Sequence, residues 1–478
     1  MKTRIKKYIG DKTFYKMALA IIIPVVVQQL ILSIAGYTDN LMISSYSQTA
    51  YAGVSTANRF MFLMNFFWIG LASGIAVFVA QYFGAKDKKR ITATIQLSLI
   101  VAVLFGILST FMIYYIGPLV IKLFIPGTGI EELKAYNHGV DYIRLIAIGG
   151  IIMLLNFMVS TIYRSLGKPK IPMYAGIVGI IVNIILNFIL IFGLFGLTPM
   201  GAKGAAIATV ISKVVELLIL LYVALFHDKE KYIRRIFKSF EIDLPLFKLY
   251  FKKATPILLN EILWALGVQI LARLITGGHY DWLRAFNYSQ NVTDLFFIYF
   301  GGIATGTAIL VGAALGEGDF EKARNYANKL IGIAVMASAI ALIFLISLSP
   351  ALLLILTPID AVYWSAYHLI LVTSVFAVLY GYNAVIYFIL RAGGDSLRAF
   401  FLDQLPTYFV GIPLTYLLHE MEYKWQLGLI LIFAATRIID VVKVVFSTYF
   451  YKKETWVQNL TILTPSLNAS VAGVGEEA

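Results

Sequence analysis

Long apolar segments, separated by short charged or Gly- and Pro-containing stretches, recur along the whole chain. Most of them are near the length of about 20 residues that an α-helix needs to cross a hydrocarbon core of roughly 30 Å. The pattern predicts twelve spanning helices, approximately at residues 17–44, 52–82, 92–124, 138–165, 171–195, 202–227, 248–276, 288–315, 324–356, 363–391, 399–419 and 426–450. We therefore expect an all-α, polytopic membrane protein.

Basic residues cluster in every second connection between these segments. Examples are KDKKR at 86–90, RSLGKPK at 164–170 and the long link at 228–253, whereas the connections at 44–50 and 357–360 carry few charges or none. Lys and Arg concentrate in cytoplasmic loops of membrane proteins. The alternation predicts a multi-pass protein of the cell membrane with both termini in the cytoplasm, and it places residues 131–138 and 279–282 in outside loops.

Composition narrows the class of protein further. With 60% hydrophobic and 14% charged residues and a mean hydropathy of +0.82, a chain of 478 residues could not hide its apolar surface as a soluble protein. The net charge of +13 is explained by the cytoplasmic loops, so no nucleic-acid partner is expected. There is no cysteine, HExxH motif or P-loop, and we predict neither an enzyme nor a cofactor requirement.

The link after the sixth predicted helix is the longest and most charged connection, and it divides the helices six and six. We predict an N-terminal lobe at 1–227, a cytoplasmic linker at 228–247, a C-terminal lobe at 248–453 and a flexible tail at 454–478. The tail is rich in small and polar residues, which favours disorder.

The two halves repeat each other's landmarks. Shifts of 232, 227 and then 224 residues superpose Pro24 on Pro256, Gln29 on Glu261, Gly84 on Gly316, Asn156 on Asn383, Lys213 on Arg437 and Glu216 on Asp440. Because both halves begin on the same side, they are parallel repeats, related by an axis along the membrane normal. Two pseudo-symmetric six-helix lobes of this kind are typical of transporters that alternate access by rocking one lobe against the other.

One carboxylate, Asp39, lies within the first apolar run. A charge at the centre of a bilayer costs roughly 2.5–3.5 kcal/mol on insertion scales, so Asp39 is a functional candidate. The alternative is that it lies near the outer end of its helix and faces water. Pro24 and Pro256 each remove a helix hydrogen bond, and we expect hinges there in the first and seventh helices.

Several motifs carry a resemblance to a known family. They are RAGGDSLRAF at 391–400, YRSLGKPK at 163–170, NIILNFILIFG at 183–193 and GAKGAAIAT at 201–209. Over residues 1–450 the chain resembles the multidrug and toxic compound extrusion (MATE) transporters, in particular their bacterial branch related to the DNA-damage-inducible protein F. The resemblance implies a two-lobed antiporter that exports cationic or amphipathic organic compounds in exchange for H⁺ or Na⁺.

The resemblance also implies a cation-coupling site in the N-terminal lobe, made of Asp39, Asn183, Asn187 and Thr209, with Na⁺ as a possible ligand. Asn187 departs from the aspartate that is frequent in the family. A single carboxylate makes the site less anionic, which lowers the expected sodium affinity and favours a carboxylate that simply takes up a proton. The alternative is that the amides are interhelical hydrogen bonds that hold the lobe together.

In the C-terminal lobe, Glu261 matches a position where many relatives carry a glutamate implicated in coupling. There is no acid between residues 362 and 390, so we expect Glu261 to rely on Asn383 as a neutral neighbour. The alternative is a structural hydrogen bond. Further polar residues predicted to bind substrate or to line the lobes are Gln28, Gln29, Asn156, Asn260 and Asn383.

Other intramembrane charges are interpreted as structural. Lys213 with Glu216, and Arg437 with Asp440, stand three residues apart and can pair on their own helices. Lys443 is expected to extend to the cytoplasmic interface. Arg164 and Arg391 end their helices beside glycines, which favours capping and anchoring on the inside rather than chemistry.

The expected partners are small organic cations and membrane lipids, and the protein is expected to be a monomer. Two other classes of function stay open. A lipid-linked precursor flippase of the same superfamily would have a more cationic cavity, and a channel or receptor-like protein would not need the repeat. Efflux of organic cations against a gradient would separate the antiporter from both.

Overall fold

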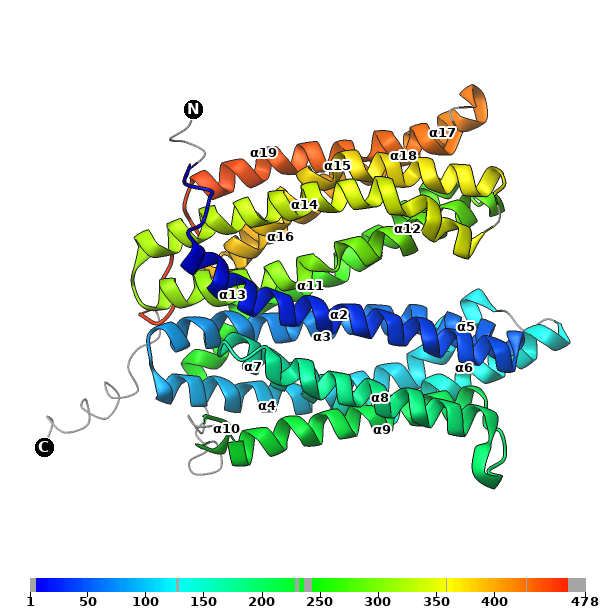
Figure 1. The fold of residues 1–478 in the computed structure, drawn as a ribbon, viewed down its shortest axis with the longest axis horizontal. Coiled ribbons are helices and arrows are strands. Elements are labelled where there is room, and N and C mark those ends of the chain that lie inside the picture. The colour runs from blue at the N-terminus through cyan, green and yellow to red at the C-terminus, as the bar shows by residue number, and fades with distance from the viewer. Residues whose placement is uncertain are drawn as a thin grey trace, which may run out of the picture.

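The computed structural model describes residues 6–125, 129–227, 232–235, 243–357, 359–426 and 428–462. Within these residues the chain forms helices and no strand, as the sequence predicts. Figure 1 shows long helices that run side by side, with the first and last described residues at the same end of the bundle. We call this end the terminal end and the opposite one the distal end.

Twelve spans are formed by the described residues. In chain order they are α2 (Lys12–Tyr46), α3 (Gln48–Gly84), α4 (Lys88–Phe111) continued by η1 (Met112–Ile116) and α5 (Gly117–Phe124), α6 (Ile130–Ile148) with α7 (Gly150–Ser165), α8 (Lys170–Phe192), α9 (Ala202–Tyr222) with η3 (Val223–His227), α11 (Leu244–Thr276), α12 (Tyr280–Phe297) with α13 (Tyr299–Gly316), α14 (Phe320–Leu356), α15 (Ala361–Ala392), α16 (Ser396–Leu405) with η4 (Pro406–Gly411) and α17 (Ile412–Trp425), and α18 (Gly428–Thr436) with α19 (Ile438–Lys452). Residues 131–138 and 280–282, expected to lie in loops, instead belong to α6 and α12, which begin at Ile130 and Tyr280; the side of the membrane on which they lie stays a prediction.

Nine of these segments are each long and apolar enough to cross a bilayer, and α6 with α7, bent by 54°, makes a tenth. The last two spans carry charged residues inside them, among them Asp403 on α16 and Asp440 on α19. These charges lower the local hydropathy, so the two spans are defined by their packing in the bundle rather than by composition.

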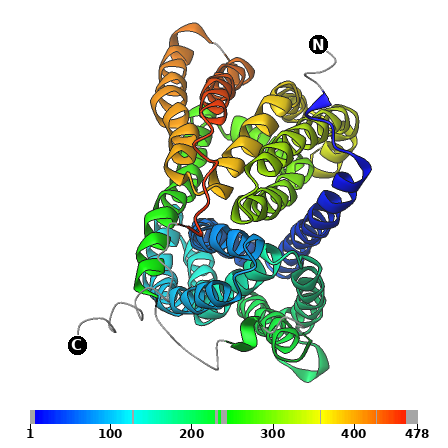
Figure 2. The ribbon, with the colours of Figure 1, turned by 90° about the vertical axis from the view of Figure 1, so that its left-hand side faces the viewer.

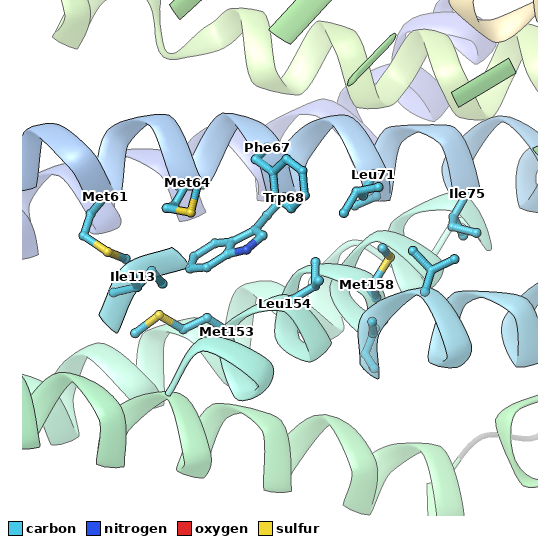
Figure 3. Close-up of a cluster of buried hydrophobic side chains, with 14 of the residues drawn as sticks. Met61, Met64, Phe67, Trp68, Leu71, Ile75, Ile113, Met153, Leu154 and Met158 are labelled. Atoms are coloured by element: carbon cyan, nitrogen blue, oxygen red, sulfur yellow. The ribbon is translucent and has the colours of Figure 1, made fainter. Parts of the chain in front are cut away.

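A large aromatic residue organises the N-terminal lobe. Trp68 of α3 is 1% exposed and lies among methionines and aliphatic side chains of α3, η1 and α7, as Figure 3 shows. Its indole Nε1 donates a hydrogen bond to Ser109 Oγ of α4 at 2.9 Å. The indole therefore buries its apolar surface and still satisfies its single donor, the usual condition for a buried tryptophan.

Two helices cross between the lobes, which the predicted boundaries at 1–227 and 248–453 did not anticipate. The first half of α2, with Phe14 and Ile22, packs into the core of the C-terminal lobe. Conversely the beginning of α11, with Tyr250 and Ile257, belongs to the core of the N-terminal lobe. Figure 2, a view onto the terminal end, shows α2 and α11 on opposite sides of the molecule at the boundary between the two groups of helices.

The lobes meet on their symmetry axis through glycines at the terminal end. A Cβ atom at Gly84 of α3 would collide with the carbonyl oxygen of Ala313, and a Cβ atom at Gly316 of α13 would collide with that of Gln81. The two contacts are related by the 232-residue shift found in the sequence. Only a residue without a side chain permits this backbone approach.

A second repeated contact corrects the register of the later helices. Asn156 Nδ2 donates to the carbonyl oxygen of Lys213 at 2.7 Å, and Asn383 Nδ2 donates to that of Asp440 at 2.9 Å. Both bonds span 57 residues, so they equate Lys213 with Asp440 by a shift of 227. The expected shift of 224, which matched charge to charge, is about one helical turn away from this register.

The segment after α19 packs against the helices beyond residue 454, where the flexible tail was predicted to begin. In the tail expected to be flexible from residue 454, Trp456 and Leu460 are 1% and 0% exposed. The backbone N–H of Leu460 donates to Gln81 Oε1 at 2.7 Å, which ties this segment to α3 of the other lobe. Two apolar side chains thus hold a polar segment in place, and residues 463–478 lie outside the described residues. The predicted linker is described only at α10 (Tyr232–Arg235) and from residue 243.

Candidate functional site

Asp39, on the distal half of α2, meets amide side chains from α8. Asn187 donates a hydrogen bond from Nδ2 to Asp39 Oδ1 at 2.6 Å. Asn183 lies one turn earlier on the same face of α8, and its hydrogen bonds are satisfied when its nitrogen points to Asp39, at 3.0 Å from Oδ1 and 3.2 Å from Oδ2. Thr209 of α9 stands beside Asn183, with its hydroxyl 3.5 Å from the amide.

The structure therefore brings together the four residues Asp39, Asn183, Asn187 and Thr209, while their role in coupling stays a prediction. Asp39 is half-buried rather than facing bulk water, and Asn187 is fully buried. Within the described residues, the partners of this carboxylate are neutral: no Lys, Arg or His forms a salt bridge with it. Such a carboxylate can change its charge by taking up a proton or binding a metal cation.

The orientation of the amides bears on which cation fits. Both Asn183 and Asn187 present nitrogen to Asp39, which suits an anionic acceptor. A sodium ion needs oxygen ligands, so at least one amide would have to turn over. Asn187 Oδ1 is buried without a hydrogen-bond partner, and it is an oxygen that could be recruited in this way.

A separate cavity of about 600 Å³ lies between the lobes. Its lining comes from α2, α3, α7 and α9 of one half and from α11, α13 and α15 of the other. Of the predicted polar residues, Gln28, Gln29, Asn156 and Glu261 line it, whereas Asp39 and its amide partners do not. The structure thus divides the predicted site into a carboxylate cluster on the distal half of α2 and a central cavity.

Glu261 of α11 is held by a fixed cation. Arg391 of α15 donates from Nη1 to Glu261 Oε1 at 2.8 Å and to the hydroxyl of Tyr387 at 2.9 Å. The side chains of Arg391 and Glu261 are 9% and 11% exposed. The expected anchoring role of Arg391 is wrong: it turns inward and neutralises the glutamate, because an unpaired charge at this depth would be very costly.

A second ion pair, which the sequence did not reveal, lies next to Glu261. Lys443 of α19 donates to Asp403 Oδ1 of α16 at 2.5 Å, and Asn260 Nδ2 donates to Asp403 Oδ2 at 3.1 Å. The predicted extension of Lys443 to the interface is therefore incorrect. The spacing of 40 residues between Asp403 and Lys443 gave no periodic signal, although an acid and a base inside two neighbouring spans hinted at a pair.

Asn383 does not support Glu261 as expected. Its amide donates to the carbonyl of Asp440, and its Oδ1 accepts a hydrogen bond from Ser447 at 2.9 Å. Gln28 is likewise engaged, donating to the carbonyl of Pro172 at 3.1 Å. Gln28 and Asn383 therefore each form a hydrogen bond between two helices.

One further acid was missed by the sequence interpretation. Asp294 of α12 lies within electrostatic range of Tyr37 on α2 and Tyr380 on α15. In the described part of the chain it makes no hydrogen bond or salt bridge, and it does not line the central cavity. A lone acid within a predicted span was the signal that could have identified it.

Comparisons with known proteins agree with this fold. The chain is 25% identical over 415 residues to an uncharacterized transporter, YisQ, of Bacillus subtilis, covering 85% of this chain and 88% of the relative. It is 25% identical over 383 residues to the probable multidrug resistance protein YoeA of the same organism, covering 79% and 81%. A crystal structure of MATE in the straight conformation has a TM-score of 0.83 at 21% identity, covering 95% of this chain and 98% of that one.

The family model described as MatE matches the chain twice, at residues 24–189 and 256–417. The two matches begin at Pro24 and Pro256, the first pair of landmarks in the internal repeat. Together they cover more than half of the chain and fall one in each six-helix half. The protein is therefore a multi-pass membrane protein that belongs to the MATE family of transporters.

Proposed function

We propose that this protein is a secondary antiporter that exports amphipathic organic compounds in exchange for H⁺ or Na⁺, and that Asp39 is the coupling carboxylate. The observation that carries the proposal is that Asp39 is a half-buried carboxylate with only neutral partners among the described residues. An incoming cation can therefore neutralise Asp39. A carboxylate that is already paired with Lys or Arg is neutralised without an incoming cation. Because both amides present nitrogen rather than oxygen to Asp39, they offer no ligand to a sodium ion in this orientation, and we take the proton as the first candidate.

Helix α2 connects this charge change to the arrangement of the lobes. Asp39 is bound to α8 of the N-terminal lobe, while Phe14 and Ile22 of the same helix pack in the core of the C-terminal lobe. Pro24 lies between these two attachments and removes a backbone hydrogen bond there. Loss of charge on Asp39 weakens the bonds from Asn183 and Asn187, so α2 can bend at Pro24 and shift one lobe against the other.

We place the terminal end in the cytoplasm, because the basic connections predicted to be inside lie there. The residues at this end include Lys86, Lys168 and Lys322. One elementary charge moving inward across 100 mV supplies about 2.3 kcal/mol, which corresponds to roughly 50-fold accumulation per charge at full coupling. A single titrating carboxylate is sufficient for export of this size.

The test is efflux of a fluorescent amphiphile from proteoliposomes under separately imposed proton and sodium gradients. We expect Asp39→Asn to abolish gradient-driven efflux while the protein still folds, because an amide can replace the carboxylate among the neutral partners. Glu261→Gln together with Arg391→Gln, which removes both members of an internal pair, is the matched control and should keep gradient dependence. Full gradient-driven efflux by Asp39→Asn at normal expression would contradict the proposal.

A further inference from the structure

The charged residues that line the central cavity do not balance. Three cations, Arg164, Lys213 and Arg391, face two carboxylates, Glu216 and Glu261. The lining is therefore cationic by one charge when all five groups are ionised. This is unexpected for a protein whose family resemblance implies organic cations as substrates, and it bears directly on which head group the cavity accepts.

Both carboxylates already form ion pairs with basic side chains of the protein. Lys213 Nζ is 2.7 Å from Glu216 Oε2, and Arg391 Nη1 is 2.8 Å from Glu261 Oε1. The carboxylate side chains are 8% and 11% exposed. A cationic substrate would have to displace one of these bases: Arg391, whose side chain is 9% exposed and which would be left as a buried unpaired charge, or Lys213, which is 30% exposed and would lose its ion pair.

Arg164 is the cation that lacks a partner. In the described part of the chain its guanidinium makes no hydrogen bond or salt bridge, and its Nε is buried without one. The carboxylate of Glu216 is within electrostatic range of Arg164, but Lys213 already binds it. A guanidinium presents several donors in a fixed planar fork that matches carboxylate and phosphate oxygens.

The remainder of the lining is suited to a hydrocarbon group. Apolar and aromatic side chains from both lobes surround the charges, among them Leu32, Trp68, Phe157 and Phe388. The volume of about 600 Å³ lies within the range of ligand pockets. The cavity thus combines an apolar wall from both lobes with one uncompensated guanidinium.

We infer that the central cavity binds amphiphiles with an anionic head group, a carboxylate or a phosphate, and that Arg164 binds this head group. The inference rests on the proposed function and specifies the charge of its substrate. Asp39 lies outside the cavity lining, so the inward cation and the anionic substrate use different residues. Arg391 and Lys213 keep their internal partners, so these two ion pairs are neutral and the net charge of the lining is that of Arg164.

Binding of a matched pair of probes tests this inference. One naphthalene fluorophore with an octyl chain is made in two forms, ending in a carboxylate or in a trimethylammonium group, and the affinity of each for the full-length protein in nanodiscs is measured by anisotropy. We expect the carboxylate form to bind at least tenfold more tightly. Tighter binding of the trimethylammonium form to the native protein would overturn the inference, and this comparison needs no variant that might misfold.

Single substitutions test whether Arg164 binds the head group. Arg164→Gln should weaken binding of the carboxylate form at least tenfold and leave the trimethylammonium form unchanged, Arg164→Lys should keep part of the affinity, and Glu216→Gln should strengthen it. Arg144→Gln removes the same charge on α6, where the guanidinium lies 5.3 Å from the Tyr114 ring and outside the cavity, and should have no effect. Equal losses for Arg164→Gln and Arg144→Gln, or trimethylammonium binding that depends on Asp294, would contradict the assignment.

Two further measurements separate the sources of the head group and the two proposals. Displacement of the carboxylate probe by an isoprenoid phosphate indicates a phosphorylated lipid, and displacement only by a fatty acid indicates a free amphiphile. If the carboxylate probe binds through Arg164 but its transport ignores ion gradients, the antiport proposal fails and the binding inference stands. If transport is gradient-driven yet selects the trimethylammonium form, only the binding inference fails.

Discussion

The two lobes have related helices, but Asp39 in one and Glu261 in the other have opposite kinds of partner. In the N-terminal lobe, Asp39 is bound by two amides and by no cation among the described residues. In the C-terminal lobe, Glu261 is paired with Arg391 and Asp403 with Lys443, at 2.8 and 2.5 Å. Of these three carboxylates, Asp39 alone has neutral partners, and Glu261 and Asp403 are each balanced by a cation.

The difference bears on which carboxylate can be the coupling group. A carboxylate with neutral partners is stable in either charge state, so an external cation can decide which state it adopts. A buried carboxylate with a fixed basic partner loses a strong interaction when it takes up a proton. The proposed exchange at Asp39 therefore belongs to the N-terminal lobe, whereas the ion pairs of Glu261 and Asp403 join helices of the C-terminal lobe.

The largest expected effect is at the Glu261 pair. Arg391→Met leaves the glutamate buried without its cation and should lower the free energy of unfolding by about 3–5 kcal/mol. The double variant Arg391→Met with Glu261→Gln should recover most of that loss in thermal unfolding. By comparison, Asp39→Asn should change stability little. A double variant as unstable as Arg391→Met alone would show that the pair is not coupled.

Substitution of the two glycines that meet on the symmetry axis should lower the free energy of unfolding by similar amounts in the two lobes. Gly84→Ala and Gly316→Ala each force a Cβ atom against a backbone carbonyl and should cost about 1–3 kcal/mol. Gly36→Ala on α2 is the control, since nothing lies within 4 Å of its added Cβ atom. Unequal costs at Gly84 and Gly316 would mean that the lobes are not symmetric at this contact.

A second carboxylate beside Asp39 should make this site differ further from the cation-paired carboxylates of the C-terminal lobe. Asn187→Asp supplies an oxygen ligand and a negative charge, and it should raise sodium affinity by about tenfold, equivalent to 1.4 kcal/mol. The measurement is the rise in melting temperature with NaCl, with choline chloride as the ionic-strength control. No sodium-specific stabilisation would indicate that the geometry around Asp39 accepts only a proton.

The smallest effect is expected at an exposed ion pair that ties α2 to the C-terminal lobe. Asp11 Oδ1 accepts a hydrogen bond from Lys329 Nζ of α14 at 3.0 Å, and this bond lowers the pKa of Asp11 below its ordinary value. Its stabilisation is therefore complete above the pKa of the unfolded chain, near 3.9, and is lost as pH falls through the lowered value.

Asp11→Asn should accordingly reduce the melting temperature slightly at pH 7, and the difference from the native protein should shrink below about pH 4. Parallel melting curves at both pH values provide the measurement. A difference that grows as the pH falls would contradict the assignment. Together, Asp11→Asn and Arg391→Met compare the stabilisation by an exposed ion pair with that by a buried one.

Much of the fold follows from the sequence alone. Apolar length fixes the spans, because a helix must satisfy its backbone within the bilayer, and the repeat fixes two halves of six. The motif around Asn183 and Asn187 also placed both amides on one helical face, which Asp39 then meets. These features depend on local periodicity, and local periodicity is visible in a linear pattern.

The tertiary structure decided which charges meet. Asp403 and Lys443 are 40 residues apart, Glu261 and Arg391 are 130 apart, and α2 and α11 each enter the core of the other lobe. Whether Arg164 is an anchor or an unpaired cation in a cavity likewise depends on what packs around it. The sequence specifies each side chain's chemistry, but the free energy of a buried charge depends on its neighbours in space.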